Sequence, residues 1–172
     1  NHLVFGVKRD VTTEHEGEVS TILHDEISEG DMINLSAPVG GFSIENTERP
    51  QLFIGSGVGM TPLVSMFKKA ASLNVPTQMI QAVVTEDERP FAQKLDSITD
   101  NYEQAQLHLH VKDKEGYLEA KELEQYLSEQ PEIYICGGTK FLHSIINSLK
   151  ELNYDMNHVH FETFIPRLSV QV

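Results

Sequence analysis

Several things are scarce in this sequence, and each scarcity excludes a class of protein. Its 172 residues contain one cysteine and no tryptophan, so an internal disulfide framework is excluded and a reducing, cytoplasmic location is expected. Only 13 Lys and Arg oppose 26 Asp and Glu, which gives a net charge of −13. A chain this acidic repels nucleic-acid phosphates and anionic lipids, so we expect neither nucleic acid nor a membrane as a partner.

Long apolar runs are also missing. No segment approaches the roughly 18 consecutive apolar residues of a membrane span. The opening NHLVFGVKRD is not typical of a signal peptide, because it lacks both a charged start and an apolar stretch. Since the first residue is Asn and not Met, we expect the chain to be part of a longer protein.

Residues 1–47 have the pattern of β-structure. The segments LVFGVKR and DMINLSAPVGGFSI have the apolar character of strands, and GEVSTILHDEISEGD between them predicts one short helix flanked by turns. Two or three strands leave long unpaired edges, so we do not expect this part to be a stable domain by itself.

Residues 48–172 alternate between strand and helix patterns. The expected strands are QLFIG, TQMIQAVVT, LHLHV, EIYIC and HVHFE, and the expected helices are TPLVSMFKKAASL, ERPFAQKLDSI, LEAKELEQYLSEQ and TKFLHSIINSLKEL. Repeated units of this kind need crossover connections, which predicts an α/β fold with a five-stranded parallel sheet and helices on both faces. The acidic excess is concentrated in residues 86–132, with 13 acids against 5 bases.

The segment LFIGSGVGMTP is the most informative motif. An apolar strand runs into three glycines, and we expect Thr61 to cap a helix that has Pro62 at its first position. Glycines at such a turn let the backbone approach a ligand, and a helix N-terminus offers N–H groups to a phosphate. The motif is not the dinucleotide fingerprint G-x-G-x-x-G, because position 60 is Met. A tight turn that binds nothing is the alternative.

A second glycine turn occurs in EIYICGGTKF, where Thr139 is expected to cap the next helix. Cys136 would end its strand at the same sheet edge as the first loop, although a lone cysteine is most often a small buried hydrophobic residue. Two glycine turns at one edge of a parallel sheet favour a ligand crevice there.

These motifs, with HFETF near the end, resemble the ferredoxin–NADP reductase superfamily, whose pattern is a G-x-G-x-T-P loop, a C-G-P turn and a terminal E-x-F. The likeness is greatest to the FAD- and NAD-binding reductase portion of flavohemoglobins (nitric oxide dioxygenases). The resemblance implies that residues 1–47 are part of an FAD-binding antiparallel β-barrel and that residues 48–172 are an NAD-binding α/β domain. It implies an oxidoreductase that passes hydride from NADH to FAD and electrons on to a haem domain or another acceptor protein.

The resemblance also implies roles for individual residues. Those implied to hold the nicotinamide dinucleotide are Gly57, Gly59, Met60, Thr61, Pro62, Glu86, Cys136, Gly137 and Gly138. Those implied to meet the flavin are Gly17, Val19, Ser20, Thr21 and Phe164. A role in catalysis, beside the reacting rings, is implied for Cys136, Glu162 and Phe164. No metal site is implied.

The sequence departs from the family in three places. The flavin-binding R-x-Y-S/T motif is absent and is expected to precede residue 1. Gly138 stands where the family has Pro, and Gly41 stands where flavohemoglobins usually have Asp.

The loop TEDERPF after the second strand bears on the choice of dinucleotide. The end of this strand is expected to meet the adenosine ribose, where NADP needs a cation and NAD can donate its 2′-hydroxyl to a carboxylate. Glu86, Asp87 and Glu88 would repel a 2′-phosphate, and we expect Arg89 to be the only nearby cation. We therefore predict a preference for NADH over NADPH; a solvated acidic loop is the alternative.

Other interpretations were weighed. The pairs His108/His110 and His158/His160 could bind a transition metal, but hydrogen-bonded or exposed histidines are favoured because no carboxylate or Cys accompanies them at ligand spacing in the sequence. Ser20, His24 and Asp25 do not sit in the G-x-S-x-G elbow of a hydrolase. The alternative functions are the reductase component of an oxygenase and a dinucleotide-binding regulatory module without flavin turnover.

Overall fold

The computed structural model describes residues 3–9, 17–37 and 39–163 of the chain. Its contacts divide into two compact units, Asn1–Gly41 and Phe42–Val172. Residues 42–47 therefore lie with the second unit, a few residues before the boundary expected from the sequence. Among the residues that the structure describes, no helix has the length and apolarity needed to cross a bilayer.

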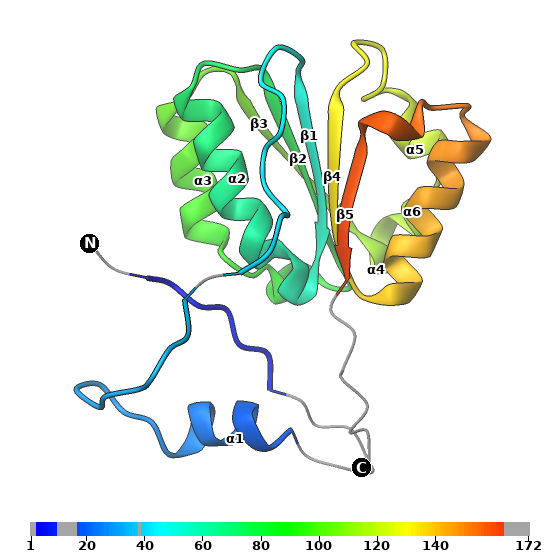
Figure 1. Ribbon diagram of the computed structural model, residues 1–172. Helices are drawn as coiled ribbons and strands as arrows, with labels where there is room; N and C mark the ends of the chain where they lie inside the picture. Colours follow the sequence, from blue (N-terminus) through cyan, green and yellow to red (C-terminus); the bar gives the residue numbers. More distant parts are fainter. Residues whose placement is uncertain (1–2, 10–16, 38, 164–172) are drawn as a thin grey trace, which may run out of the picture. The chain divides into compact units, whose positions relative to one another are not determined.

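The second unit is built on a five-stranded sheet in which every pairing is parallel (Figure 1). The strands are β1 Gln51–Ser56, β2 Thr77–Val83, β3 Ala105–Val111, β4 Glu132–Gly137 and β5 Val159–Thr163. The helices are α2 Met60–Ser72, α3 Ala92–Asn101, α4 Lys112–Glu115, α5 Ala120–Glu124 and α6 Thr139–Glu151. Short 3-10 turns are η1 Gly57–Gly59, η2 Glu86–Glu88 and η3 Met156–His158. The strand order β3-β2-β1-β4-β5 confirms the predicted α/β fold.

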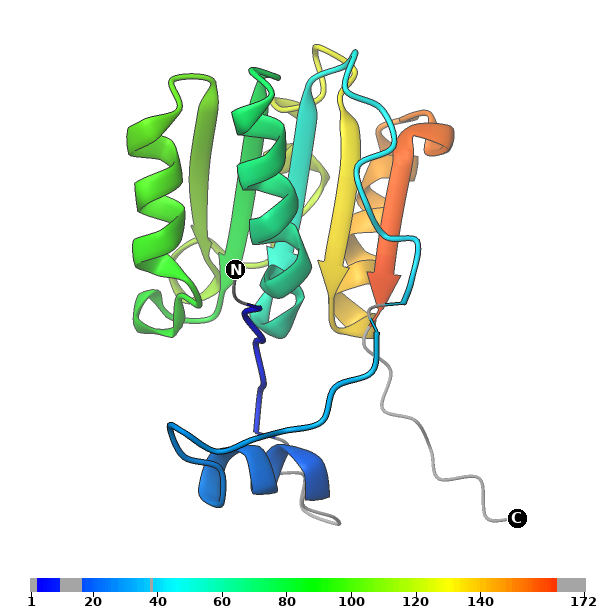
Figure 2. The same ribbon diagram turned by 60° about the vertical axis from the view of Figure 1, so that its left-hand side comes forward.

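Alternate residues of each strand point to opposite faces of the sheet. Both faces therefore carry apolar side chains, and helices cover both of them. Phe53 and Tyr134 belong to the core on the side of α2 and α3. Ile54 and Ile135 belong to the core on the side of α5 and α6. Figure 2 shows the helices on the two faces of the sheet. The central strands β1 and β4 are buried on both faces, which explains why they read as continuous apolar runs.

One predicted helix is much shorter than expected. The segment LEAKELEQYLSEQ forms only α5, which starts at a capping box between Glu119 and Glu122. After Glu124 the backbone changes to i to i−3 hydrogen bonds, from the N–H groups of Tyr126 and Leu127. These tighter turns end the helix and lead the chain directly into β4.

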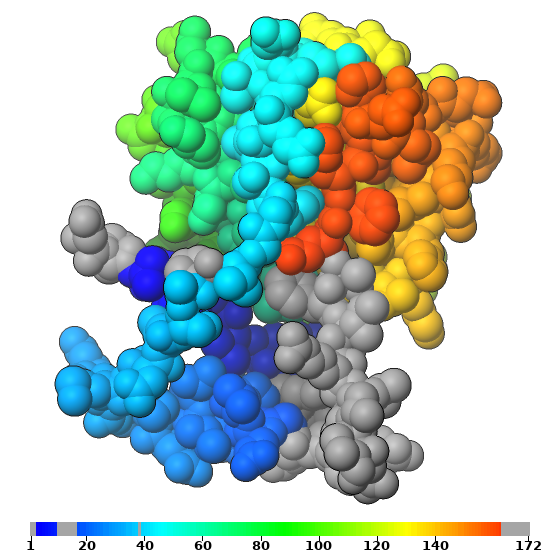
Figure 3. Space-filling model, viewed as in Figure 1, coloured from blue at the N-terminus to red at the C-terminus, as the bar shows by residue number. Residues whose placement is uncertain are grey.

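The segment from Phe42 to Arg49 covers the part of the sheet that α2 and α3 leave open. The ring of Phe42 meets the edge of Tyr134 at a centroid distance of 6.1 Å, and Ile44 packs on the same core. The backbone N–H of Glu45 donates to the Tyr134 hydroxyl at 3.0 Å. In the space-filling view this segment, in cyan, lies at the surface beside β5 (Figure 3).

The described residues of the first unit form one helix, α1 Glu18–Asp25, as predicted. The strands predicted in residues 1–45 are absent from the described residues, since no neighbouring strand supplies ladder hydrogen bonds. None of the described residues up to Gly41 is buried, and apolar side chains such as Phe5, Val19 and Met32 are exposed. The described residues of this unit therefore form no core of their own.

A buried carboxylate anchors the amino end of β4. The Glu132 side chain is 4% exposed and lies 2.8 Å from His158 Nδ1 and 2.9 Å from His160 Nε2. Arg49 Nη1 lies 3.0 Å from His158 Nε2, and a guanidinium can only donate. His158 therefore accepts from Arg49 at Nε2 and donates to Glu132 from Nδ1.

The pKa of Glu132 reflects these contacts. Burial raises the pKa of this carboxyl, but the hydrogen bonds from His160 and His158 favour the carboxylate and outweigh burial, so the pKa is lowered. The anion, not the acid, is the form that the fold stabilises.

We expect Glu132→Gln to lower the free energy of unfolding by about 1.5–3 kcal/mol at pH 7, because two partly buried histidine donors lose a buried charged acceptor. Since the folded pKa is lowered, this contribution is complete above the unfolded pKa of about 4.3. It is lost as the pH falls through the lower folded pKa. Urea unfolding of both proteins at several pH values measures the difference.

Glu129→Gln, which changes an exposed carboxylate nearby, is the control and should change stability by less than about 0.5 kcal/mol. Equal stability of Glu132→Gln and the parent protein at pH 7 would contradict this account.

Candidate functional site

The two glycine turns meet where the strand order of the sheet reverses. From β1 the chain moves outward through β2 to β3, and it returns to place β4 on the other side of β1. The carboxyl ends of β1 and β4 therefore border the topological switch point, where open parallel sheets bind their ligands. η1 follows β1 directly, and Gly138 follows β4.

Gly59 makes the closest approach between these turns. A Cβ at Gly59 would lie 2.3 Å from the carbonyl oxygen of Cys136 and 2.6 Å from the nitrogen of Gly137. No side chain fits between the two backbones. The turn after β1 therefore contacts the last peptide of β4 directly, and the two glycine turns form one continuous surface.

The exposed side of the two turns is open. Gly57 has φ +55, a conformation that favours glycine, and a Cβ on Gly57 or Gly138 would meet nothing within 4 Å. At Gly137, in contrast, a Cβ would lie 2.6 Å from Phe141 Cδ1. Backbone is therefore presented to solvent at Gly57 and Gly138, as close contact with a phosphate or ring requires.

Both predicted helix caps are wrong by one or two positions. Helix α2 is capped by Gly59, and Thr61 lies inside its first turn, where its hydroxyl donates to the Val58 carbonyl at 2.8 Å. Helix α6 is capped by Gly138, and Thr139 is its first residue. Gly59 ends the 3-10 turn η1 with a helical conformation, whereas Gly138 is extended, and in both cases the threonine already belongs to the α-helix. Pro62 remains in the first turn, where its missing N–H costs nothing.

Cys136 lies beneath this surface. It is fully buried in the core on the side of α2 and pairs in register with Gly55 and Glu162. Burial and, to a lesser extent, the charge of Glu162 raise the pKa of the Cys136 thiol to about 12. The thiol is protonated at neutral pH, so Cys136 is suited to packing and not to nucleophilic chemistry.

The remaining predicted residues divide between core and surface. The Met60 side chain is fully buried, whereas Glu162 is exposed on β5. Phe164 lies outside the described residues. Gly17 caps α1, which carries Val19, Ser20 and Thr21, and both the Ser20 hydroxyl and the Thr21 N–H donate to the Gly17 carbonyl at 2.9 Å.

A cavity of about 540 Å³ opens at the same edge of the sheet, on the side of α6. Its lining includes Ser56 at the end of β1, Val84 after β2, Lys112 and Tyr117 after β3, and Lys140 on α6. The Lys112 ammonium lies 4.6 Å from the centroid of the Tyr117 ring. The cavity connects the carboxyl ends of β1, β2 and β3, which is the path that an extended dinucleotide needs.

Sequence reasoning missed this lining. Lys112 and Tyr117 were not among the predicted site residues, yet they follow a strand whose carboxyl end lies at the ligand edge. The position of these residues directly after the third strand was the available clue.

The acidic turn η2 is exposed and lies after β2. We predicted Arg89 to be the only nearby cation, and this is wrong. Lys114 of α4 forms an ion pair with Glu86, while Arg89 contacts Gln81 Oε1 at 3.3 Å and Asp96 Oδ1 at 3.0 Å. The hydrogen bond to Lys114 lowers the pKa of Glu86, and the same bond raises that of Lys114. The tertiary contact was invisible because 28 residues separate the partners.

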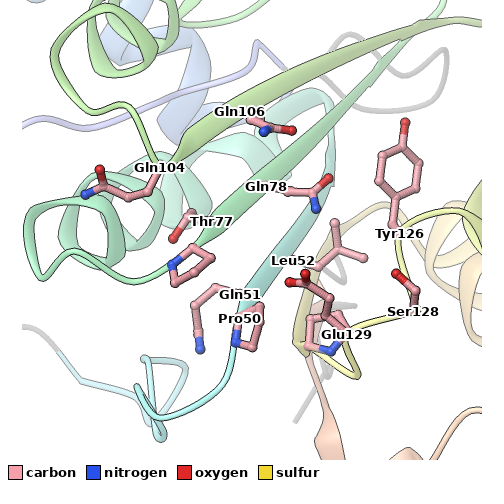
Figure 4. A pocket seen from close by; sticks show the side chains of 12 residues that line it. Pro50, Gln51, Leu52, Thr77, Gln78, Gln104, Gln106, Tyr126, Ser128 and Glu129 are labelled. Carbon is pink, nitrogen blue, oxygen red and sulfur yellow. The ribbon is translucent and has the colours of Figure 1, made fainter.

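The opposite, amino edge of the sheet holds a second hollow of about 350 Å³ (Figure 4). Its lining is mostly proline, amide and hydroxyl side chains with one carboxylate, Glu129, and includes no Lys, Arg or His. The carbonyl oxygen of the buried Gln51 side chain has no hydrogen-bond partner among the described residues. A pocket without a cation, at the edge away from the glycine turns, is unsuited to a dinucleotide pyrophosphate.

The four paired histidines each have a hydrogen-bond partner. His108 Nε2 lies 3.2 Å from Gln78 Oε1, and burial lowers the pKa of His108. His110 Nε2 lies 3.0 Å from the Gly116 carbonyl, and the other two histidines bind Glu132. In the described part of the chain, no group of three His, Cys, Asp or Glu residues is arranged to hold a metal ion.

Fold and site together define a class: a dinucleotide-binding α/β domain with its ligand surface at the switch point. The sequence agrees, since residues 53–146 match the family of oxidoreductase NAD-binding domains. The chain belongs to this family, within the ferredoxin–NADP reductase superfamily.

Individual relatives are consistent with this assignment. A flavohemoprotein of Bacillus cereus is 30% identical over 91% of this chain, and the chain spans 43% of that protein's length. The crystal structure of the flavohem-like FAD/NAD binding domain of nitric oxide dioxygenase from Vibrio cholerae superposes with a TM-score of 0.84, at 28% identity over 93% of this chain and 70% of that one. The cytochrome b5 reductase domain of Ulva prolifera nitrate reductase shares the fold, with a TM-score of 0.75, at 17% identity over 92% of this chain and 70% of that one.

We expect Gly59→Ala to destabilise the second unit by about 1–3 kcal/mol, because the added methyl must push the two backbones apart. Gly138→Ala is the matched control: its φ of −67 is ordinary and its surroundings are open, so stability should be unchanged or slightly raised. Thermal or urea unfolding measures both. A Gly59→Ala protein as stable as its parent would show that the turns do not touch.

We expect native protein to react very slowly with a thiol reagent such as 5,5′-dithiobis(2-nitrobenzoate) at pH 8, because Cys136 is buried and protonated. Unfolding in guanidinium should release one equivalent of reactive thiol per chain. Fast stoichiometric reaction of the folded protein would exclude the buried placement of Cys136.

Proposed function

We propose that this chain is the dinucleotide-binding part of an NAD(P)H-dependent flavin oxidoreductase, which takes hydride from NADH to FAD and sends electrons to a haem domain or another acceptor. The family match and the flavohemoprotein and nitric oxide dioxygenase relatives support this reaction class. The chain spans less than half of the flavohemoprotein relative, so the reaction of the whole protein belongs to this proposal.

The observation that carries the proposal is the contact of Gly59 with the Cys136–Gly137 peptide at the switch point. It joins two glycine turns into one open backbone surface, beside a cavity that runs to the end of β2. The residues present fit a dinucleotide: open glycine backbone for the pyrophosphate, Lys140 at the start of α6, and the Tyr117 ring in the cavity lining.

The chain's residues would act by binding and orientation. Gly57, Gly59 and the first turn of α2 would hold the pyrophosphate side, because backbone N–H groups and a helix start favour an anion. The Cys136–Gly137 peptide would support the nicotinamide ring with a neutral surface. When bound, the dinucleotide and the flavin supply the hydride transfer themselves.

Flavin contact is proposed for the first unit and the end of β5. Gly17 has an extended conformation and no side-chain cap from the described residues, and a helix start favours an anion such as a pyrophosphate. Glu162, exposed on the strand beside Cys136, and Phe164 are proposed to lie near the reacting rings.

We also propose that NADH is preferred over NADPH. Asp87 and Glu88 on η2 are exposed, and Glu86 occupies the cation nearest to it, Lys114. A 2′-phosphate brought to the end of β2 would meet more carboxylates than available cations.

We expect the purified chain to bind NADH and, with added FAD, to reduce ferricyanide at the expense of NADH. Calorimetry measures the binding, and NADH absorbance at 340 nm measures the turnover. Binding without turnover would favour the regulatory dinucleotide-binding module, and failure to bind any nicotinamide dinucleotide would refute the proposal.

We expect Lys140→Gln to weaken NADH binding about three- to fivefold, because it removes a cation from the cavity that would hold the phosphates. The loss should shrink at high salt. Lys150→Gln, an exposed lysine at the other end of the same helix, should leave the dissociation constant unchanged. Equal effects of the two substitutions would place the phosphates elsewhere.

A further inference from the structure

The ion pair between Glu86 and Lys114 joins two segments that border the cavity. The backbone N–H of Asp113 donates to the Val84 carbonyl at 3.1 Å, which fixes the start of α4 beside the end of β2. Val84 and Lys112 line the cavity, and Glu86 and Lys114 each follow two residues later. The pair therefore lies next to the cavity at the end of β2, where the adenosine ribose of a dinucleotide is expected.

Lys114 differs from the other cations on this side of the cavity. Arg89 is held by Gln81 and Asp96, and Lys112 lies against the Tyr117 ring. The partner of Lys114 is a carboxylate on an exposed turn, and the two side chains are 64% and 57% exposed. A ligand phosphate can reach Lys114 from solvent and compete with Glu86 for it.

We propose that Glu86 sets dinucleotide preference by occupying Lys114, the cation that would otherwise receive the 2′-phosphate of NADP. This inference rests on the proposed function and adds a specific mechanism to it. Glu86 acts twice: its charge opposes the phosphate, and its ion pair withholds Lys114 from it. Breaking the pair exposes a binding cation without changing the fold, since exposed ion pairs contribute little to stability.

The experiment compares NADP⁺ with NAD⁺ in binding assays at low salt, without flavin or turnover. We expect Glu86→Gln to improve the ratio of NADP⁺ to NAD⁺ affinity about five- to tenfold. The same improvement should be seen for 2′,5′-ADP against 5′-AMP, two fragments that differ only in the 2′-phosphate.

A double-mutant cycle distinguishes the release of Lys114 from the simple loss of charge repulsion by Glu86. In a Lys114→Gln background, Glu86→Gln should improve the ratio no more than about twofold, because no cation is released. Glu88→Gln, a carboxylate on the same turn, is the matched control and should give the same small change in both backgrounds.

An equal gain from Glu86→Gln with and without Lys114 would overturn the proposal and leave only charge repulsion. No gain in either background would overturn it as well. If neither NAD⁺ nor NADP⁺ binds to the parent protein, the proposed function fails instead, and the two failures are thereby distinguished.

Discussion

The structure of the ligand edge depends on one contact, that of Gly59 with the peptide between Cys136 and Gly137. Because the strand order reverses between β1 and β4, the loops after these two strands must share one edge. Only a residue without a Cβ lets them touch. The starts of α2 and α6 then follow from the two turns, and the cavity on the α6 side is lined by the last residue of β1 and by the end of β2.

The net charge of the chain does not reveal how the charged side chains are distributed around this edge. The chain carries 13 more acids than bases, yet lysines occur where phosphates are expected, at Lys112 and Lys140 in the cavity. Lys114 lies beside them with its charge balanced by Glu86. The acidic excess therefore does not exclude an anionic ligand; it restricts how many phosphates the edge can hold and where.

The two edges of the sheet have different tasks. At the amino edge, Glu132 joins β4, β5 and the Phe42–Arg49 segment through two histidines and an arginine. This network around a buried carboxylate fixes the strand ends, and its arginine is already bonded to Gln130 and His158. At the carboxyl edge the backbone is left open and the thiol of Cys136 is kept neutral, which suits a surface against which a cofactor ring packs.

Periodicity and glycine spacing by themselves determined the five strands, the helices α2, α3 and α6, and the two turns, because apolar alternation and strand-to-helix glycines are local properties. Three features needed the tertiary structure. The length of α5 depends on the i to i−3 hydrogen bonds that follow it. The helix caps depend on the backbone conformations of Gly59 and Gly138. The partner of Glu86 lies 28 residues away in the sequence. Local sequence specifies which elements form, whereas contacts between elements distant in sequence decide which cations remain available to a ligand.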